Sequence, residues 1–267
     1  MTRLTAEWLK GMEEGLIAYD RKLTALIGMD LSSLACRGAG IPHITKEDMK
    51  RHKAAVVRVT AGKGVIGSFA ESVLAVLRHM GADAAIPECC DVAGMHEAVS
   101  GGTEILFMAD DDRFVAINVK TGMVAENDYA TACGYVAALS AMAGGLAGKE
   151  VLLLGYGRVG KRALKCLLAE GAKVSLFDRD RGKTATMQGN RVTLLEQLQL
   201  PLSGLILDAT SEGGYLGEGD ISAGTLISAP GVPLSLNKEA FQLHHSRLMH
   251  DPLQTGVAVM LALAVKD

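Results

Sequence analysis

The chain has 267 residues, of which 49% are hydrophobic and 21% are charged, and its formal net charge is −3. This length is enough for one large domain or for two smaller ones. Because the sequence has no basic block and no apolar run of the ~18 residues that span a bilayer, neither nucleic acid nor a membrane is an implied partner.

Helical patterns dominate the first 50 residues. Residues 5–27 carry apolar side chains in steps of three and four, which predicts an amphipathic helix. Gly11 and Gly15 each weaken this helix by about 1 kcal/mol relative to alanine. Further short helices are expected to begin at Asp30 and Thr45.

Strands and helices then alternate. Residues 54–60 are typical of a buried strand, and the glycine-rich turn after them leads into a helix. Ser68 and Glu71 fit a capping box at the start of that helix, in which each side chain accepts from a backbone N–H. A substrate-binding role of Ser68 would be additional to capping.

The next apolar strand runs directly into Asp110, Asp111 and Asp112. Ligands of open α/β sheets bind outside the carboxyl ends of the strands, which is where these carboxylates fall. Three interpretations are open: a solvated acidic turn, a Mg²⁺ site, and recognition of a cationic substrate group. We expect no metal, because no other oxygen-ligand cluster accompanies them. The following segment predicts a hairpin that turns at residues 120–122.

The segment 151–160, VLLLGYGRVG, joins an apolar strand to glycines at G-x-G-x-x-G spacing. An amphipathic helix and a second strand that ends at Asp178 follow, so the pattern predicts a dinucleotide site. The first glycine permits the tight turn, the second lets a pyrophosphate approach the backbone, and the third lets helix and strand pack closely. The expected contact residues are Gly155, Tyr156, Gly157, Arg158, Val159 and Gly160.

Asp178 also bears on the identity of the dinucleotide. Its carboxylate would accept hydrogen bonds from the adenosine ribose and would repel a 2′-phosphate, which favours NAD over NADP. Arg179 could bind such a phosphate, but we prefer to interpret it as a solvated residue over the adenine.

Further strands are expected at residues 191–195, 204–210, 225–230 and 247–251, and an apolar helix at 255–265. Two of these strands end where the nicotinamide half of the cofactor should lie, at Ala209, Thr210, Ala229, Pro230 and Gly231. His250 is interpreted either as a hydrogen-bonded structural residue or as a catalyst.

These elements predict an α/β protein with two domains. An N-terminal α/β substrate domain with a connecting helix is expected at residues 1–148. A C-terminal Rossmann domain with a mostly parallel, doubly wound sheet is expected at 149–267, with the active site between the domains. Five cysteines without a C-x-x-C pair indicate reduced thiols in a cytoplasmic protein.

Several strings occur together over nearly the whole chain. They are LTAEWL, VTAGKGVIGSFAES, EILFMADDDRF, VLLLGYGRVG, ISAPGVP and HDPLQTGVA. The glycine fingerprint is shared with many dehydrogenases, whereas GKGVIGSF and MADD are far more specific. In the order and spacing of these strings, the chain resembles the pyrrolysine-forming dehydrogenases of pyrrolysine biosynthesis, the PylD family.

The resemblance implies a cytoplasmic, NAD-dependent enzyme that acts on the small molecule 3-methylornithyl-lysine. It would oxidise the terminal amine of the ornithine moiety to an aldehyde, which condenses with the neighbouring amine to form the pyrroline ring. This chemistry requires neither a metal nor a nucleic-acid or membrane partner, and it is compatible with a homodimer.

Carboxylates are the natural partners of the ammonium groups of such a substrate. Asp110 and Asp111 are therefore candidate catalytic residues. The candidate substrate-binding residues are Leu4, Ala61, Ser68, His250 and Asp251. Serine is commoner in the family where Ala61 stands, and glutamate is commoner where Asp251 stands. The N-terminal helix is expected to act as a lid, with Leu4 and Trp8 over the aliphatic stem of the substrate.

Two rival functions fit parts of the sequence. Another NAD(P)-linked dehydrogenase, acting on an opine-like or cyclic amino acid, would carry the same Rossmann half. An NAD-sensing protein without turnover would bind the nucleotide but would have no obvious use for the acidic segment.

Overall fold

The computed structural model describes residues 5–9, 11–185, 187 and 189–266, and their contacts divide the chain into two units. Within these residues, the first unit takes 5–24, 29–134 and 252–266, and the second takes 25–28 and 135–251. The closing segment therefore groups with the first unit, whereas the predicted division at residue 148 assigned it to the second.

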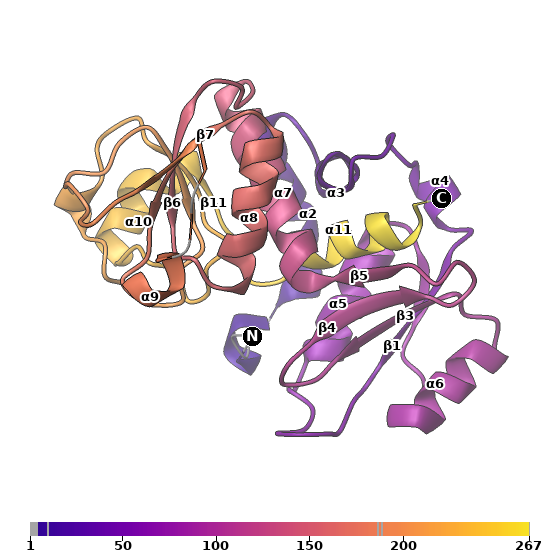
Figure 1. The fold of residues 1–267 in the computed structure, drawn as a ribbon. Helices are drawn as coiled ribbons and strands as arrows, with labels where there is room; N and C mark the ends of the chain where they lie inside the picture. Colours follow the sequence, from indigo (N-terminus) through magenta and orange to yellow (C-terminus); the bar gives the residue numbers. More distant parts are fainter. Residues whose placement is uncertain (1–4, 10, 186, 188, 267) are drawn as a thin grey trace. The chain divides into compact units, whose positions relative to one another are not determined.

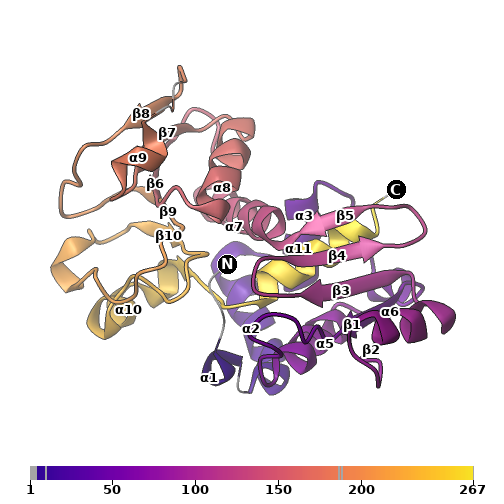
Figure 2. The same cartoon turned by 60° about the horizontal axis from the view of Figure 1, so that its bottom comes forward.

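Among the described residues, the first unit contains a five-stranded sheet in the order β2-β1-β3-β4-β5 (Figure 2). The first three strands of that order pair in parallel, and β4 and β5 are antiparallel. The turn between β4 and β5 confirms the predicted hairpin at residues 120–122. The strands are β1 Lys53–Val57, β2 Asp83–Ala85, β3 Ile105–Ala109, β4 Phe114–Asn118 and β5 Val124–Glu126.

Helices cover both faces of this sheet. Because successive side chains of a strand point to opposite faces, Ala55 and Val57 of β1 meet Ala98 of α6, while α5 and α11 pack on each other and on the other face. These helices are α1 Ala6–Leu9, α2 Met12–Ile27, α3 Leu31–Ala39, α4 Lys46–Met49, α5 Phe69–His79, α6 Asp91–Ser100 and α11 Gln254–Ala264, with the last turn of α2 grouped in the second unit.

The helix predicted at residues 5–27 is divided at Gly11, whose φ of +72° belongs to the left-handed region. Below the break, α2 buries Leu16 and Leu23 as the apolar spacing predicted. Asp30 and Thr45 cap α3 and α4 through their side chains, as expected.

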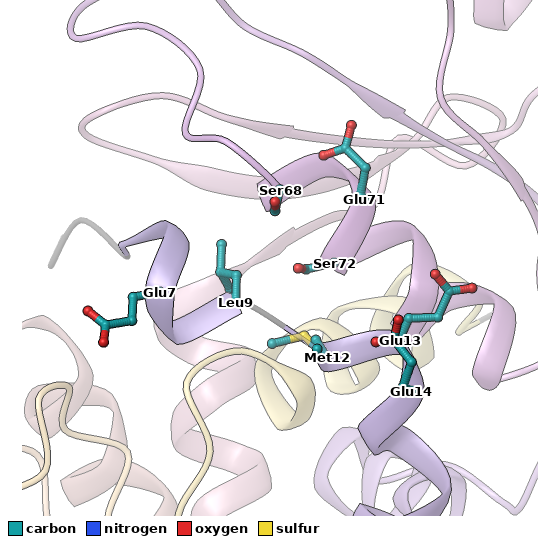
Figure 3. Close-up of a pocket in the computed structure, with 9 residues that line it drawn as sticks. Glu7, Leu9, Met12, Glu13, Glu14, Ser68, Glu71 and Ser72 are labelled. Atoms are coloured by element: carbon teal, nitrogen blue, oxygen red, sulfur yellow. The ribbon is translucent and has the colours of Figure 1, made fainter.

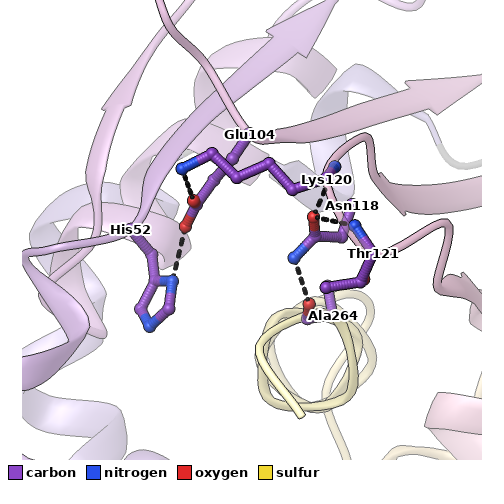
Figure 4. Close-up of polar contacts among 6 residues, drawn as sticks. All are labelled: His52, Glu104, Asn118, Lys120, Thr121 and Ala264. Carbon is purple, nitrogen blue, oxygen red and sulfur yellow. Dashed lines mark hydrogen bonds and ion pairs between the residues drawn. The ribbon is translucent and has the colours of Figure 1, made fainter. Parts of the chain in front are cut away.

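Helix α11 is apolar on all sides, and its residues 255–264 are buried. Its contacts are with α3, α5, β4 and β5 of the first unit. Asn118, at the end of β4, fastens the end of this helix, because its Nδ2 donates to the carbonyl oxygen of Ala264 at 2.9 Å (Figure 4). An all-round apolar helix must be buried, and here the first unit provides the site.

A buried carboxylate lies beside this attachment. Glu104, whose side chain is 10% exposed, accepts from Nδ1 of His52 at 2.5 Å and from Nζ of Lys120 at 2.7 Å (Figure 4). Burial raises the pKa of Glu104, but the hydrogen bonds from Lys120 and His52 outweigh burial and hold the pKa below its ordinary value.

Replacing Glu104 by glutamine should reduce the loss of stability in acid. A carboxyl whose pKa is lowered by folding stabilises the protein above its unfolded pKa of about 4.3, and this contribution is lost as the pH falls through the folded pKa. Urea unfolding at pH 7 and below pH 4 measures the effect. The exposed Glu47→Gln variant is the control. If the free energy of unfolding falls as much between pH 7 and acid pH in Glu104→Gln as in the wild type, the prediction is contradicted.

The second unit contains, among its described residues, a six-stranded sheet in the order β8-β7-β6-β9-β10-β11, with every pair parallel. This is the doubly wound order 3-2-1-4-5-6, so the predicted sheet is confirmed. The strands are β6 Glu150–Leu154, β7 Lys173–Phe177, β8 Val192–Leu194, β9 Leu205–Asp208, β10 Leu226–Ser228 and β11 Leu248–Met249.

Helix α8 (Arg158–Ala169) packs on β6 and β7 (Figure 1). Ala163, Leu164 and Leu167 are among its buried residues. The order of the sheet reverses between β6 and β9, so the switch point lies at the carboxyl end of β6. The other helical segments are α7 Asn127–Ala143, which contributes to both units, α9 Arg181–Thr184, η1 Glu218–Asp220, α10 Lys238–His244 and η2 His245–Arg247. None of the helices in the described part of the chain combines the length and apolar character that crossing a bilayer needs.

Candidate active site

The glycine fingerprint forms the turn from β6 into α8. Gly155 has a φ of +86°, and an added Cβ there would lie 2.9 Å from the carbonyl group of Ala209. An added Cβ at Gly160 would overlap the carbonyl oxygen of Gly155. Side chains are therefore excluded at both positions, and the tight turn and the close packing of helix and strand both depend on glycine.

Gly157 is different, because an added Cβ there meets no atom within 4 Å. This glycine is the N-cap of α8 and provides no side chain to cap the first N–H groups of the helix. Open space beside helix N–H groups is what a pyrophosphate requires. Arg158, which is exposed, and the half-buried Val159 begin the helix. Tyr156 donates its hydroxyl hydrogen to Sδ of Met187 at 3.0 Å.

Asp178 follows β7 and holds the fingerprint turn. Its Oδ2 accepts from the backbone N of Tyr156 at 2.6 Å, and its Oδ1 accepts from the backbone N of Asp180 at 2.8 Å. The side chain is 9% exposed, and Nζ of Lys183 lies 3.6 Å from Oδ1. Each carboxylate oxygen has further acceptor capacity, so the arrangement is compatible with a ribose hydroxyl.

Arg179 forms an ion pair with Glu212 at 2.5 Å. Both side chains are exposed, so the pair adds little to stability. The pair connects the loop after β7 to the loop after β9, and these two strands flank β6 in the sheet. Arg179 is thus solvated, and it also has a carboxylate partner that the sequence did not indicate.

The ends of β9 and β10 meet beside the fingerprint. The backbone N of Ala209 donates to the carbonyl oxygen of Leu154 at 2.8 Å, and that of Gly231 donates to the carbonyl oxygen of Asp208 at 3.1 Å. Ala229 and Pro230 are buried. An added Cβ at Gly231 would overlap the carbonyl oxygen of Thr210. The predicted cofactor residues of the second unit therefore gather at the switch point of the sheet.

Asp110 and Asp111 lie in the turn between β3 and β4 in the first unit. Oδ1 of Asp110 accepts from the backbone N of Asp112 at 2.8 Å and of Arg113 at 2.7 Å, and these bonds hold the pKa of Asp110 below its ordinary value. Oδ2 of Asp111 accepts from the backbone N of Lys63 at 2.8 Å. Asp110 thus forms an acidic turn, and Asp111 joins that turn to the glycine-rich loop after β1.

Ser68 does not form the predicted capping box. It has a φ of +67°, and its side chain makes no capping hydrogen bond. An N-cap residue normally has extended backbone, and the left-handed conformation directs the hydroxyl away from the first N–H groups of α5. Glu71 instead lies 3.8 Å from the guanidinium of Arg58. Ala61 is exposed in the same loop.

A pocket of about 590 Å³ lies in the first unit where α1 and α2 face the start of α5 (Figure 3). Its described lining includes four glutamates and no lysine or arginine, so the pocket is electronegative. Leu9 and Met12 provide apolar surface. Carboxylates beside an apolar wall suit an aliphatic ammonium group. The lining residues are Glu7, Leu9, Gly11, Met12, Glu13, Glu14, Ser68, Glu71 and Ser72.

His250 and Asp251 follow β11 in the second unit. Nδ1 of His250 donates to the carbonyl oxygen of Ala229 at 2.8 Å, which places the proton of the neutral imidazole on Nδ1. The hydroxyl of Tyr135 accepts from the backbone N of Asp251 at 2.9 Å and donates to its carbonyl oxygen at 2.8 Å. The buried Tyr135 therefore positions Asp251, which is 5% exposed.

Two polar residues, Tyr135 and Asp208, are not among those that the sequence patterns predict. Tyr135 lies in an alanine-rich helix and carries no local signal. Asp208 has a local signal, because an acid at the end of the apolar string LILD is followed by the hydroxyl of Thr210.

Leu4 and the side chain of Trp8 lie outside what the structure describes, so their lid contacts stay a prediction. Among the described His, Cys, Asp and Glu side chains, no group of three or more is placed to hold a metal ion.

The parallel sheet and the glycine turn define the class: an α/β protein whose second unit has the Rossmann fold. Shikimate 5-dehydrogenase of Thermus thermophilus, solved with NADP(H) and shikimate, is 15% identical, with 80% of this chain and 91% of that chain covered and a TM-score of 0.51. The bifunctional methylenetetrahydrofolate dehydrogenase/cyclohydrolase FolD of Campylobacter jejuni is 12% identical, with 95% and 96% covered and a TM-score of 0.53. These similarities show the fold alone.

Sequence comparisons define the family. The model for the N-terminal domain of the pyrrolysine biosynthesis protein PylD matches residues 9–125. Pyrrolysine synthase of Methanosarcina acetivorans is 31% identical over 98% of this chain and 98% of its own length. That of Methanosarcina barkeri is 29% identical over 98% and 97%. The chain belongs to the PylD family of pyrrolysine biosynthesis, which confirms the resemblance of its sequence strings.

Proposed function

We propose that this protein uses NAD to oxidise the terminal amine of the ornithine moiety of 3-methylornithyl-lysine. The observation that carries the proposal is the match, over nearly its whole length, to a protein named pyrrolysine synthase. The amine loses a hydride and a proton to give an imine, and water replaces ammonia to give the aldehyde. The aldehyde then condenses with the neighbouring amine and loses water to close the pyrroline ring.

The residues that would bind the cofactor lie in the second unit. NAD supplies the acceptor for the hydride. The turn at residues 155–160 would hold the diphosphate, since Gly157 leaves open space beside the N-terminus of α8. Asp178 would accept from the adenosine ribose, and its negative charge disfavours a 2′-phosphate. The strand ends at Thr210 and Gly231 would border the nicotinamide half.

The aspartate carboxylates can bind ammonium groups of the substrate, but a carboxylate beside the reacting amine would oppose the reaction. Only a neutral amine can lose a hydride, whereas an alkyl ammonium has a pKa of about 10.4. A carboxylate against the reacting nitrogen stabilises its charged form. Asp110, Asp111 and Asp251 therefore hold ammonium groups that do not react, or one of them accepts the released proton through water. Ring closure is intramolecular, so proximity alone assists it.

The decisive experiment combines enzyme, NAD and 3-methylornithyl-lysine. We expect reduced nicotinamide to form, measured by its absorbance, together with a product that has lost ammonia and two hydrogens, measured by mass spectrometry. An NAD-sensing protein would bind NAD without amine-dependent reduction. A dehydrogenase for opine-like amino acids would reduce NAD with those substrates and not with this one. Either result would overturn the proposal.

Replacing Asp110 by asparagine should raise KM for the amine substrate about tenfold, because one charge-assisted hydrogen bond is lost. KM for NAD should not change. The amide oxygen can still accept from the backbone of Asp112 and Arg113, so the turn should stay folded. Steady-state kinetics measure both constants, and Asp112→Asn in the same turn is the control. An equal rise of KM for the amine in both variants would show that Asp110 has no specific role in binding the substrate.

A further inference from the structure

A buried carboxylate that the proposed chemistry does not use lies at the end of β9. Asp208 is 1% exposed, and its register partner is Leu154, the last residue before the fingerprint turn. Its Oδ1 accepts from the backbone N of Thr210 at 3.0 Å and from Oγ1 of Thr210 at 2.6 Å. Its Oδ2 contacts the hydroxyl of Ser235. Both oxygens are thus engaged with neighbouring donors.

These contacts determine the direction of the Thr210 hydroxyl. A backbone N–H can only donate, so Oδ1 of Asp208 is an accepting oxygen, and the hydroxyl hydrogen of Thr210 also points to it. Burial raises the pKa of Asp208, against the hydrogen bonds from Ser235 and Thr210. If the carboxyl takes a proton, Oδ2 carries it and Ser235 becomes the acceptor. The Thr210 hydroxyl donates to Asp208 in either state.

With its hydrogen engaged, Oγ1 of Thr210 presents only lone pairs to other groups. The hydroxyl of Tyr215 lies 3.5 Å away and is therefore the donor of that pair. Burial raises the pKa of Tyr215 to about 12, so this hydroxyl keeps its hydrogen at neutral pH. Thr210 is half-buried, and its backbone N lies 3.0 Å from where a Cβ of Gly155 would stand. Thr210 is therefore a hydrogen-bond acceptor beside the fingerprint turn.

We infer that Asp208 is a positioning residue that fixes the Thr210 hydroxyl as an acceptor for the nicotinamide riboside half of the dinucleotide. This inference rests on the proposed function. The donors of that half are the carboxamide NH₂ and the ribose hydroxyls. A threonine free to rotate would direct its own hydrogen at those donors for part of the time, and the affinity would fall.

The test compares Asp208→Asn with Asp208→Ala. Asparagine keeps an accepting oxygen toward Thr210 and can donate its NH₂ to Ser235, so NAD affinity should stay within about threefold of the wild type. Alanine removes the acceptor, and NAD should bind about tenfold more weakly, as expected for the loss of one hydrogen bond. Calorimetric titration measures these affinities.

Two further ligands define the outcome. ADP, which lacks the nicotinamide half, should bind all variants equally. The 3-acetylpyridine analogue of NAD lacks the carboxamide N–H. If Asp208→Ala weakens NAD but not this analogue, the carboxamide is the donor, and if both weaken, a ribose hydroxyl is. Equal weakening of ADP, or equal losses in Asp208→Asn and Asp208→Ala, would overturn the inference.

A second pair of variants avoids dependence on the folding of Asp208→Ala. Thr210→Val removes the hydroxyl and leaves Asp208 in place, and it should weaken NAD about tenfold, whereas Thr210→Ser should restore binding. Unchanged affinity in Thr210→Val would overturn the inference. If the wild-type protein binds no NAD, the proposed function itself fails. If it binds NAD without oxidising the amine, only the proposed reaction fails.

Discussion

Replacing Gly157 by alanine should leave the protein folded and weaken NAD binding about ten- to hundredfold. The added methyl group meets no protein atom within 4 Å. Alanine is a poorer N-cap than glycine, but it also restricts the unfolded chain, so the free energy of unfolding should change by less than about 1 kcal/mol. A pyrophosphate on the N-terminus of α8 must approach this backbone closely. Crowding by a methyl group costs about 1–3 kcal/mol in close-packed surroundings. Calorimetric titration with NAD and urea unfolding measure the two effects separately.

Two other glycines provide the comparison for this variant. Gly219, in η1 of the same unit, also has open space at its Cβ position, so Gly219→Ala should change neither stability nor NAD affinity. Gly160→Ala should lower both, because its Cβ would overlap the carbonyl oxygen of Gly155. NAD affinity of the wild-type value in Gly157→Ala would show that the diphosphate does not bind at this turn.

The nucleotide-binding unit could be predicted because the residues that determine its fold lie close together in the sequence. The apolar run before Gly155, the helical spacing after Gly160 and the acid at Asp178 all lie within one β-α-β segment, and each has a separate physical cause. Parallel pairing of β6 and β7 then follows from the crossover helix between them. The helix caps at Asp30 and Thr45 could be predicted for the same reason, because a cap depends on a few adjacent residues.

The misjudged features depend on information that is not local. The pattern at Ser68 and Glu71 satisfies the capping rule in residue type, but the glycine-rich loop brings Ser68 into the left-handed region and Arg58 attracts Glu71. Helix α11 had to be buried, but its composition could not indicate which unit would bury it. Asp111 and Lys63 are 48 residues apart, so their contact appears only in the folded chain.

Replacing Tyr135 by phenylalanine should lower the free energy of unfolding by about 2–4 kcal/mol. The hydroxyl accepts from the backbone N of Asp251 and donates to its carbonyl oxygen, at a site where Tyr135 is 1% exposed. Phenylalanine keeps the buried ring but removes both bonds, and a buried polar group left unsatisfied costs about 1–3 kcal/mol. Burial and the nearby Asp251 raise the pKa of Tyr135 well above its ordinary value, so the hydroxyl can donate at any pH used for the enzyme.

Urea unfolding measures this loss, and the matched control is Tyr129→Phe, at a position that is 42% exposed. The control should change stability by less than about 0.5 kcal/mol. Because Tyr135 holds the backbone of Asp251, KM for the amine substrate should rise in Tyr135→Phe, while KM for NAD should remain at the wild-type value. A variant as stable as the wild type would show that the hydroxyl does not bond Asp251. A stability loss without a change in KM would show that Tyr135 only stabilises the fold and that Asp251 does not bind the substrate.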